Sequence, residues 1–360
     1  MKSTVRLVSL LAPFVLLHCT TTTVETRSVP VETDAGPSAV DDGGSADAGP
    51  DESEPPVADD AYYAAMSRPR ALFPSLVGKD GRIRVMGGMS DLGVSSATEV
   101  YDPTANTWTA GPSSSMRRYG HAGTTTADGD MFVVGGTADG SNPTASAALL
   151  SIATNTWADV PNMPTARLGL GAATGADGRI YAVGGRSRTG LVDVVEVYSP
   201  DTKTWATAPS MPTKRLSLLA VAGGDGKIYA IGGRDAENKP LAVVEAFDPA
   251  TETWTTVQPL GTARFWFGAA LGTDQRIYVV GGIGSGGEFL DSVEAFTPGS
   301  GWTTLAPMPE GRGWVSAAAG TDGRVFAIGG AVLPDGPVTD QPPPLSTMFG
   351  YDPKTNAWTR

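Results

Sequence analysis

The chain has 360 residues, of which 46 are Gly and 28 are Pro, while 8% are aromatic and 18% are charged. This composition holds too many turn-forming residues for a helical protein and too many apolar ones for a disordered protein. A single Cys excludes an intramolecular disulfide framework, and two His are too few for a His-rich metal site. We therefore expect no metal and no other cofactor.

The formal net charge of -12 is concentrated near the N-terminus. Residues 20–61 hold eleven carboxylates and a single Arg, so the body of the chain from residue 62 onward is close to neutral. A nucleic-acid-binding protein would present a basic face to the phosphates. We expect no nucleic-acid partner.

Residues 1–18 have the features of an export signal peptide. Two basic residues precede an apolar run over 7–17, which is too short to span a bilayer. Cys19 follows, and the segment resembles a bacterial lipoprotein signal, in which Leu16 stands three places before a Cys that becomes acylated. His18 departs from the small residue of that pattern.

The resemblance implies an exported protein that is anchored to the membrane by lipid on Cys19, at the outer membrane or the cell surface. The alternative is an ordinary secretory signal with an incidental Cys, which would give a secreted protein. Residues 19–60 are dominated by Asp, Ser, Pro, Gly and Ala, and such a segment buries too little apolar surface to offset its ordering entropy. We predict a disordered acidic linker there, followed by a folded domain over 61–360.

A glycine doublet recurs every 48 or 49 residues in the second part of the chain, and a Trp follows each doublet. The doublets are Gly87-Gly88, Gly135-Gly136, Gly184-Gly185, Gly232-Gly233, Gly281-Gly282 and Gly329-Gly330, and the tryptophans are Trp108, Trp157, Trp205, Trp254, Trp302 and Trp358. A fixed period of this length indicates a repeat architecture with six copies.

Each copy carries local signals for four strands. In the fourth copy, apolar runs at 215–223 and 227–231 flank Asp225-Gly226, a pair that favours a two-residue hairpin with both turn residues at positive φ. A third run over 242–247 precedes a fourth strand at Trp254. Four antiparallel strands form one blade, and six blades in a ring bury their faces against one another. The predicted fold class is an all-β, six-bladed β-propeller.

The unit resembles the kelch motif of β-propellers in the Arg that opens each copy, the glycine doublet and the Trp, and the resemblance covers residues 66–360. It implies a family that includes binding scaffolds, sugar-modifying enzymes and a copper oxidase, so it specifies the fold more than the function. The oxidase site needs two His and a Cys linked to Tyr, whereas this chain offers His121 alone, with Cys19 far away on the linker.

Ring closure is expected to involve the start of the folded domain. Kelch propellers commonly complete one blade with strands from both chain ends. Here residues 61–66 occupy the register just before Arg70, where every other copy has its fourth strand. We predict that they pair with the last blade beside Trp358 and clasp the ring.

One rim of the predicted propeller carries the loops that differ most between copies, together with the segments that lead into each first strand. Divergent loops on a rigid scaffold are typical of a binding protein. In related kelch modules the arginines that open the repeats line the pocket and grip acidic ligands. The alternative is that they tie each blade to its neighbour through backbone carbonyls. These residues are Arg70, Arg118, Arg167, Arg215, Arg264 and Arg312.

Five further side chains are candidates because they depart from the repeat. Arg186, Arg188 and Arg234 belong to single loops, where they either bind a ligand or are merely solvated. Trp266 and Trp314 are the tryptophans outside the repeat position, and they form either an aromatic wall for a sugar or peptide or part of the core.

The predicted function is therefore non-enzymatic: a binding or scaffold propeller on the cell envelope whose loop-rich rim takes a protein segment or a polysaccharide. The alternative is an exported sugar-modifying enzyme that resembles sialic-acid epimerases and mutarotases. Its acid and base would come from His121, Glu237 or Glu288, which are the few non-repeated candidates. A purely structural role in the envelope is a third hypothesis.

Overall fold

The computed structural model describes residues 62–333 and 342–360. The predicted signal peptide over 1–18, the lipidation candidate Cys19 and the predicted linker over 19–60 lie outside the described residues. In the described part of the chain, no helix has the length and apolarity needed to cross a bilayer.

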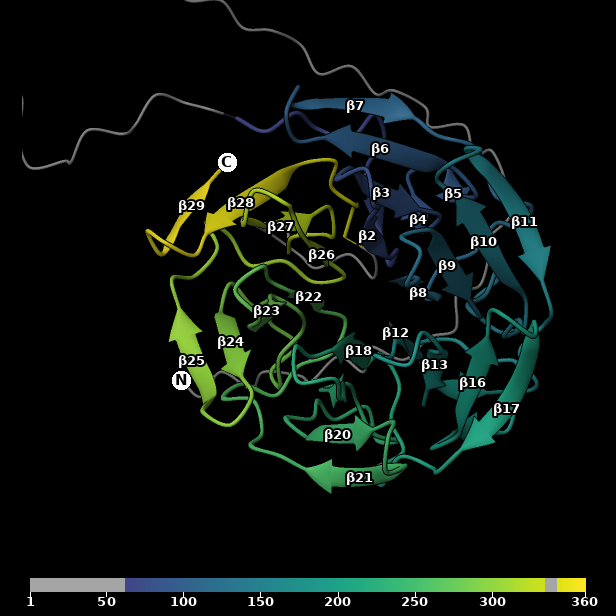
Figure 1. The fold of residues 1–360 in the computed structure, drawn as a ribbon. Coiled ribbons are helices and arrows are strands. Elements are labelled where there is room, and N and C mark those ends of the chain that lie inside the picture. The colour runs from purple at the N-terminus through teal and green to yellow at the C-terminus, as the bar shows by residue number, and fades with distance from the viewer. Residues whose placement is uncertain (1–61, 334–341) are drawn as a thin grey trace, which may run out of the picture.

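Six four-stranded antiparallel sheets stand around a common axis, as Figure 1 shows, which confirms the predicted six-bladed propeller. Each blade takes its strands in chain order from the axis outward. The first three blades are β2 (Ser75–Val77), β3 (Ile83–Met86), β6 (Thr98–Asp102) and β7 (Thr107–Ala110); β8 (Ala122–Thr125), β9 (Met131–Val134), β10 (Ala147–Ser151) and β11 (Thr156–Val160); and β12 (Gly171–Thr174), β13 (Ile180–Val183), β16 (Val195–Ser199) and β17 (Thr204–Ala208). The last three are β18 (Leu219–Ala222), β19 (Ile228–Ile231), β20 (Val244–Asp248) and β21 (Thr253–Thr256); β22 (Gly268–Leu271), β23 (Ile277–Val280), β24 (Val293–Thr297) and β25 (Gly301–Leu305); and β26 (Ser316–Ala319), β27 (Val325–Ile328), β28 (Met348–Asp352) and β29 (Ala357–Thr359). Two short ribbons add β1 (Arg70–Ala71), β4 (Met89–Ser90) and β5 (Gly93–Val94), and β14 (Arg186–Ser187) and β15 (Gly190–Leu191).

The core lies between the blades. The second strand of every blade is buried along its whole length, because neighbouring sheets cover both of its faces. Between the second and third blades, the rings of Phe132 and Tyr198 stack with their centroids 5.2 Å apart. Trp205, on the outer strand, packs against Tyr198 and donates from its indole nitrogen to the carbonyl oxygen of Pro161 in the preceding blade at 2.7 Å. The repeated tryptophans are therefore blade-packing residues.

The Asp-Gly turns differ from the predicted hairpin. In the first blade the amide of Gly78 donates to the carbonyl of Arg82 at 3.0 Å and the amide of Gly81 donates to the carbonyl of Gly78 at 2.9 Å. Gly81 has a φ of 74°, while Asp80 keeps a negative φ. The loop therefore has three residues, a type I turn followed by one left-handed residue, and the prediction of two turn residues at positive φ was wrong.

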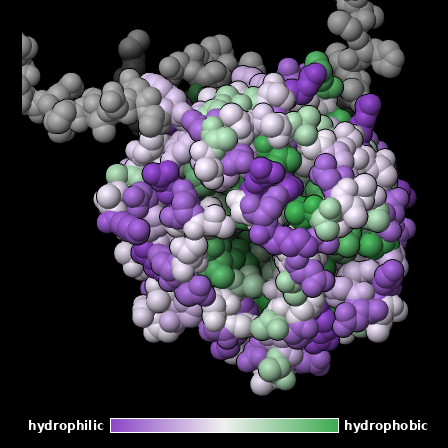
Figure 2. All heavy atoms as spheres, turned by 45° about the horizontal axis from the view of Figure 1, so that its top comes forward, coloured by the Kyte–Doolittle hydropathy of each residue, from purple (hydrophilic) through white to green (hydrophobic). Residues whose placement is uncertain are grey.

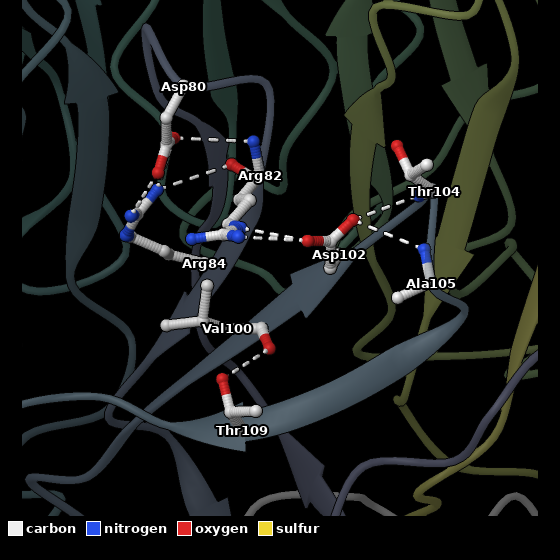
Figure 3. Close-up of polar contacts among 8 residues, drawn as sticks. All are labelled: Asp80, Arg82, Arg84, Val100, Asp102, Thr104, Ala105 and Thr109. Atoms are coloured by element: carbon white, nitrogen blue, oxygen red, sulfur yellow. Dashed lines mark hydrogen bonds and ion pairs between the residues drawn. The ribbon is translucent and has the colours of Figure 1, made fainter.

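Polar side chains on this turn side of the ring bond to one another and to the backbone of the turns, as Figure 3 shows for the first blade. Asp80 accepts hydrogen bonds from both terminal nitrogens of Arg84, at 2.8 and 2.7 Å. Asp102, at the second turn of the blade, accepts Nε of Arg82 at 3.0 Å and the amide of Thr104 at 3.0 Å. Short Asp side chains that bond to nearby backbone amides are typical of turns. The recurring aspartates are thus turn residues.

The ring closes between the sixth and first blades with help from the N-terminal segment. The amide of Tyr63 donates to the carbonyl of Arg360 at 3.0 Å. The indole of Trp108 donates to the carbonyl of Ala64 at 2.8 Å. In the other blades the equivalent indole bonds to the segment that follows the outer strand of the preceding blade, as Trp157 does to Pro112. These contacts confirm the predicted clasp for residues 62–66. The segment bonds to Arg360, the residue after β29, but it adds no strand, because the sixth blade already has four strands from the C-terminal part of the chain.

Deletion of residues 61–66 is expected to lower the melting temperature by several degrees. The deletion removes Met66, a buried side chain whose burial contributes about 1.5–3 kcal/mol, and uncovers Phe326, against which the Tyr63 ring packs with centroids 5.3 Å apart. Scanning calorimetry measures the shift. Replacing the exposed Tyr62 by Ala is the control and should leave the transition in place; an unchanged transition in the deletion variant would reject the clasp.

Candidate functional site

Six backbone amides, one from each blade, form a closed circle of hydrogen bonds around the axis. Each amide donates to the carbonyl of the equivalent residue in the preceding blade, with N···O distances of 2.6–3.4 Å. All six residues have left-handed φ angles between 50 and 61°. We call this circle the amide ring; its members are Leu72, Gly120, Gly169, Ser217, Trp266 and Trp314.

Four members of the amide ring are not glycine, and bulky residues rarely adopt this backbone conformation. Strained residues of this kind persist where the surrounding structure holds them, and they cluster at functional sites. The ring and the beginnings of the innermost strands enclose a cavity of about 140 Å³ on the axis, with a mostly apolar lining. Figure 2 shows a face of the molecule that is hollowed near its centre, with apolar side chains visible inside a largely hydrophilic surround.

An aromatic cluster lies at the amide ring between the fourth, fifth and sixth blades. Trp266 and Trp314 meet edge to face with centroids 5.8 Å apart, and Phe289 lies 5.7 Å from Trp314. The guanidinium of Arg234 lies over the ring of Trp266 at 4.6 Å and over Phe265 at 5.0 Å. We call these five residues the rim cluster. Both tryptophans are partly exposed, so they are available to a ligand as well as to each other.

Arg186 stands beside the rim cluster in the third blade, at the repeat position that Arg234 occupies in the fourth. Both follow the glycine doublet directly, a position held by uncharged residues in the other copies. Burial, and secondarily the nearby charge of Arg186, lowers the pKa of Arg234 to about 10. Arg234 nevertheless remains a cation at neutral pH. Among the described residues neither guanidinium forms an ion pair with a carboxylate, and two neighbouring positive charges of this kind favour an anion.

Several hydrogen-bond donors at this site have no partner among the described residues. They are Nε of Arg186, Nε of Arg234, the indole nitrogen of Trp314 and the hydroxyl of Ser217, all of them buried atoms. Buried polar groups in folded proteins are nearly always hydrogen-bonded, so donors left over beside a concave site leave bonds to be made to a ligand or to water. One terminal nitrogen of Arg186 donates a hydrogen bond to the carbonyl of Gly140 at 3.3 Å.

The repeated arginines lie inside the blades, with exposed fractions of 0–2%. In the third blade, Nη1 of Arg167 donates to the carbonyls of Gly184 and Val194, each at 2.8 Å, and Nη2 donates to Glu196 at 2.8 Å. The side chain therefore ties together strands of its own blade, and it cannot reach a ligand on the rim. This placement corrects the expectation that the rim is lined by the repeated arginines, which are Arg70, Arg118, Arg167, Arg215, Arg264 and Arg312.

The remaining candidates lie apart from one another. Arg188 is exposed at the tip of the β14–β15 ribbon. Glu237 and Glu288 are exposed on loops of the fourth and fifth blades. His121 lines the axial cavity, where burial and the charge of Arg118 hold its pKa well below the ordinary range. The described residues bring no two of the three acid/base candidates into contact.

His121 takes a packing position. The equivalent residues of the other blades are all buried and apolar, and His121 itself is 8% exposed. They are Phe73, Leu170, Leu218, Phe267 and Val315. Within the described parts of the chain, no group of three or more His, Cys, Asp and Glu side chains is arranged to hold a metal ion.

Three residues of the site escaped the sequence-based prediction: Ser217, Phe265 and Phe289. Phe289 is the clearest, because it pairs with Ile283 at a position where three other copies have Pro. Aligning the copies and asking which positions depart from the shared residue would have found it. The same comparison had already selected Trp266, Trp314, Arg186 and Arg234.

A closed ring of six four-stranded blades, each with its buried Arg, glycine doublet and outer Trp, defines a kelch-type β-propeller. The chain belongs to the KLHDC2/KLHL20/DRC7 Kelch-repeats domain family, whose model matches residues 74–282. The Kelch motif model also matches residues 268–309. Among solved structures, the chain is similar to that of YjhT at 15% identity, with a TM-score of 0.68 over 82% of this chain and 98% of that chain. At that identity the likeness shows the fold alone. No curated protein sequence matches the chain significantly.

Proposed function

We propose that this propeller is a non-enzymatic binding module whose rim cluster, together with Arg186, takes an acidic chain: a polysaccharide or a protein segment that carries carboxylates. The observation that supports it most directly is the Arg234 guanidinium over the Trp266 ring, with Arg186 nearby. Donors on Arg186, Arg234, Ser217 and Trp314 find no partner within residues 62–333 and 342–360. Guanidinium groups suit carboxylates because they offer two parallel N–H donors.

The aromatic wall complements the charges. The faces of Trp266 and Trp314 are suited to the apolar face of a sugar ring or to an apolar peptide side chain. Divergent loops surround this site, and the kelch scaffold holds them rigidly, as expected of a recognition surface. We further propose display on the cell envelope through a lipid on Cys19, a part of the proposal that is supported by the sequence of residues 1–19.

The full chain is expected to bind acidic members of a glycan array or of a peptide library, with uronic acids and Asp/Glu-rich peptides as the two arms. Arg234→Gln and Arg186→Gln should each weaken binding about 10- to 100-fold, since a hydrogen bond between charged groups contributes about 1.5–3 kcal/mol. Titration calorimetry gives the affinity for the best ligand from the array. Because the attraction is electrostatic, affinity should also fall as salt rises.

The matched control is Arg82→Gln, which removes one positive charge from the opposite, turn side of the ring. Its affinity should equal that of the wild type. Binding that is unaffected by both rim substitutions would place the ligand elsewhere, and the arm of the screen that responds identifies the ligand as polysaccharide or protein.

A further inference from the structure

Five blades supply a carboxylate to their buried, repeated Arg. In four of them it comes from a Glu on the third strand, as in the pair of Arg167 and Glu196 at 2.8 Å. The other three pairs are Arg70 with Glu99, Arg215 with Glu245 and Arg264 with Glu294. The sixth blade has Phe349 in place of the Glu, and there Glu310 supplies the carboxylate to Arg312 at 2.7 Å from two residues upstream.

The carboxylate also accepts backbone amides that precede the Arg by two or three residues. Glu294 accepts the amide of Gly261 at 2.6 Å and that of Thr262 at 3.1 Å. Glu99 accepts the amide of Ser67 at 2.7 Å. The guanidinium and these amides together form a cradle of donors that is filled by one carboxylate.

The second blade keeps the donors of this cradle but lacks the carboxylate. Ala148 occupies the Glu position and is fully buried. Arg118 is 2% exposed, and its Nη1 donates to the carbonyls of Ser146 and Gly135 at 3.0 and 3.3 Å. Its Nε and Nη2 have no partner in the part of the chain that the structure describes. Among the described residues, the amides of Ser115 and Met116, which correspond to the cradle amides, donate to nothing.

No neighbouring carboxylate of the described residues fills this role. The nearby carboxylate of Asp159 is exposed, accepts the hydroxyl of Ser115 at 2.7 Å and makes no ion pair with Arg118. Burial lowers the pKa of Arg118 to about 10, so the group is still charged at neutral pH. A buried charge without a partner is strongly unfavourable, and the sixth blade shows that loss of the Glu can be compensated by a carboxylate from elsewhere.

We infer that the second blade binds a small monovalent anion, of the size of formate or chloride, in the cradle formed by Arg118 and the amides of Ser115 and Met116. The anion takes the place of the Glu carboxylate of the other blades. It has a short way in, since Ser115 is exposed and Met116 is only half-buried. This site lies within a blade, away from the rim cluster, and it is independent of the proposed rim ligand.

Melting temperatures of the full chain test the inference. The anion of the buffer salt is changed from a bulky sulfonate to formate or chloride, while ionic strength and pH are held constant. The wild type should gain several degrees along a saturable curve, because a ligand that binds only the folded state stabilises it. Ala148→Glu should melt higher in sulfonate and lose the dependence on formate. Glu196→Ala opens an equivalent cradle in the third blade and should make the dependence steeper.

Bromide gives a direct readout, since its anomalous scattering in crystals should place a peak within hydrogen-bonding distance of Arg118 Nη2 in the wild type and none there in Ala148→Glu. Arg118→Met is the second variant should Ala148→Glu fail to fold; it should abolish the anion dependence. A wild type whose melting temperature ignores formate and chloride while Glu196→Ala responds would overturn the inference. The same holds if Arg118→Met keeps the full dependence.

Discussion

Replacing Glu245 by Ala is expected to lower the free energy of unfolding by about 3–5 kcal/mol. Glu245 is 1% exposed and accepts Nη1 of the fully buried Arg215 at 2.6 Å. The substitution leaves the guanidinium in the interior without its carboxylate, and the hydroxyl of Thr213 also loses an acceptor. Urea unfolding followed by tryptophan fluorescence measures the change, provided that the dependence on denaturant keeps its slope.

Two controls separate the unpaired charge from the loss of side-chain volume. The double variant Arg215→Met/Glu245→Leu removes both charges and should lie within about 1–2 kcal/mol of the wild type, since apolar side chains of similar size often replace a buried ion pair without loss. Lys214→Ala breaks the exposed pair with Asp193, whose N···O distance is 3.9 Å, and should cost less than about 1 kcal/mol. Equal losses in Glu245→Ala and in Lys214→Ala would falsify the assignment of the repeated Arg as an internal tie.

Replacing Gly135 by Ala is expected to cost about 2–5 kcal/mol. Gly135 has a φ of 70°, and a Cβ at this position would lie 2.5 Å from the carbonyl oxygen of Arg167 in the next blade. That carbonyl cannot move freely, because it accepts the amide of Gly136 at 2.8 Å across the blade boundary. The estimate combines about 1–2 kcal/mol for a left-handed residue with about 1–3 kcal/mol for overpacking.

Gly93→Ala is the matched control. Gly93 also has a positive φ, of 95°, but a Cβ there would meet nothing within 4 Å. It should therefore cost only the backbone contribution of about 1–2 kcal/mol. Chemical unfolding of the two variants side by side isolates the effect of blade contact, and a Gly135→Ala variant as stable as Gly93→Ala would show that the blades separate easily at the doublet.

The propeller could be predicted from the sequence because its period is carried by residues with strong local requirements. The first glycine of each doublet occurs where a Cβ would strike the next blade, and the second occurs where a Cβ would strike the start of its own blade. A Trp occurs where an indole bonds to the preceding blade. The turn type was harder to predict, because Asp-Gly suits both a two-residue and a three-residue hairpin loop. The choice depends on the register of the two strands, which residues outside the turn determine.

The candidate site was predicted in part, and for a definite reason. Side chains that break the repeat, such as Arg234 and Trp266, do lie together at the axis. The arginine present in every copy does not lie at the axis. It is buried inside its blade, and the blade interior is the feature that all six copies have in common. Recurrence was therefore evidence of structure, whereas departure from the repeat selected Arg234 and Trp266 but also Arg188 and His121, which lie outside the rim cluster. Contacts such as Arg234 over Trp266 join different blades, and their closeness depends on the radial geometry rather than on spacing along the chain.

The amide ring has a consequence for how many repeats this protein can hold. Its six hydrogen bonds run from each blade to the one before and return to the start through Leu72 and Trp314. A seventh blade would enlarge the circumference, and every member would have to move outward for the bonds to keep their length. The innermost strands would follow and open the axis. The circle of amides thus acts as a gauge of blade number, which links a gain or loss of one repeat to all the others at once.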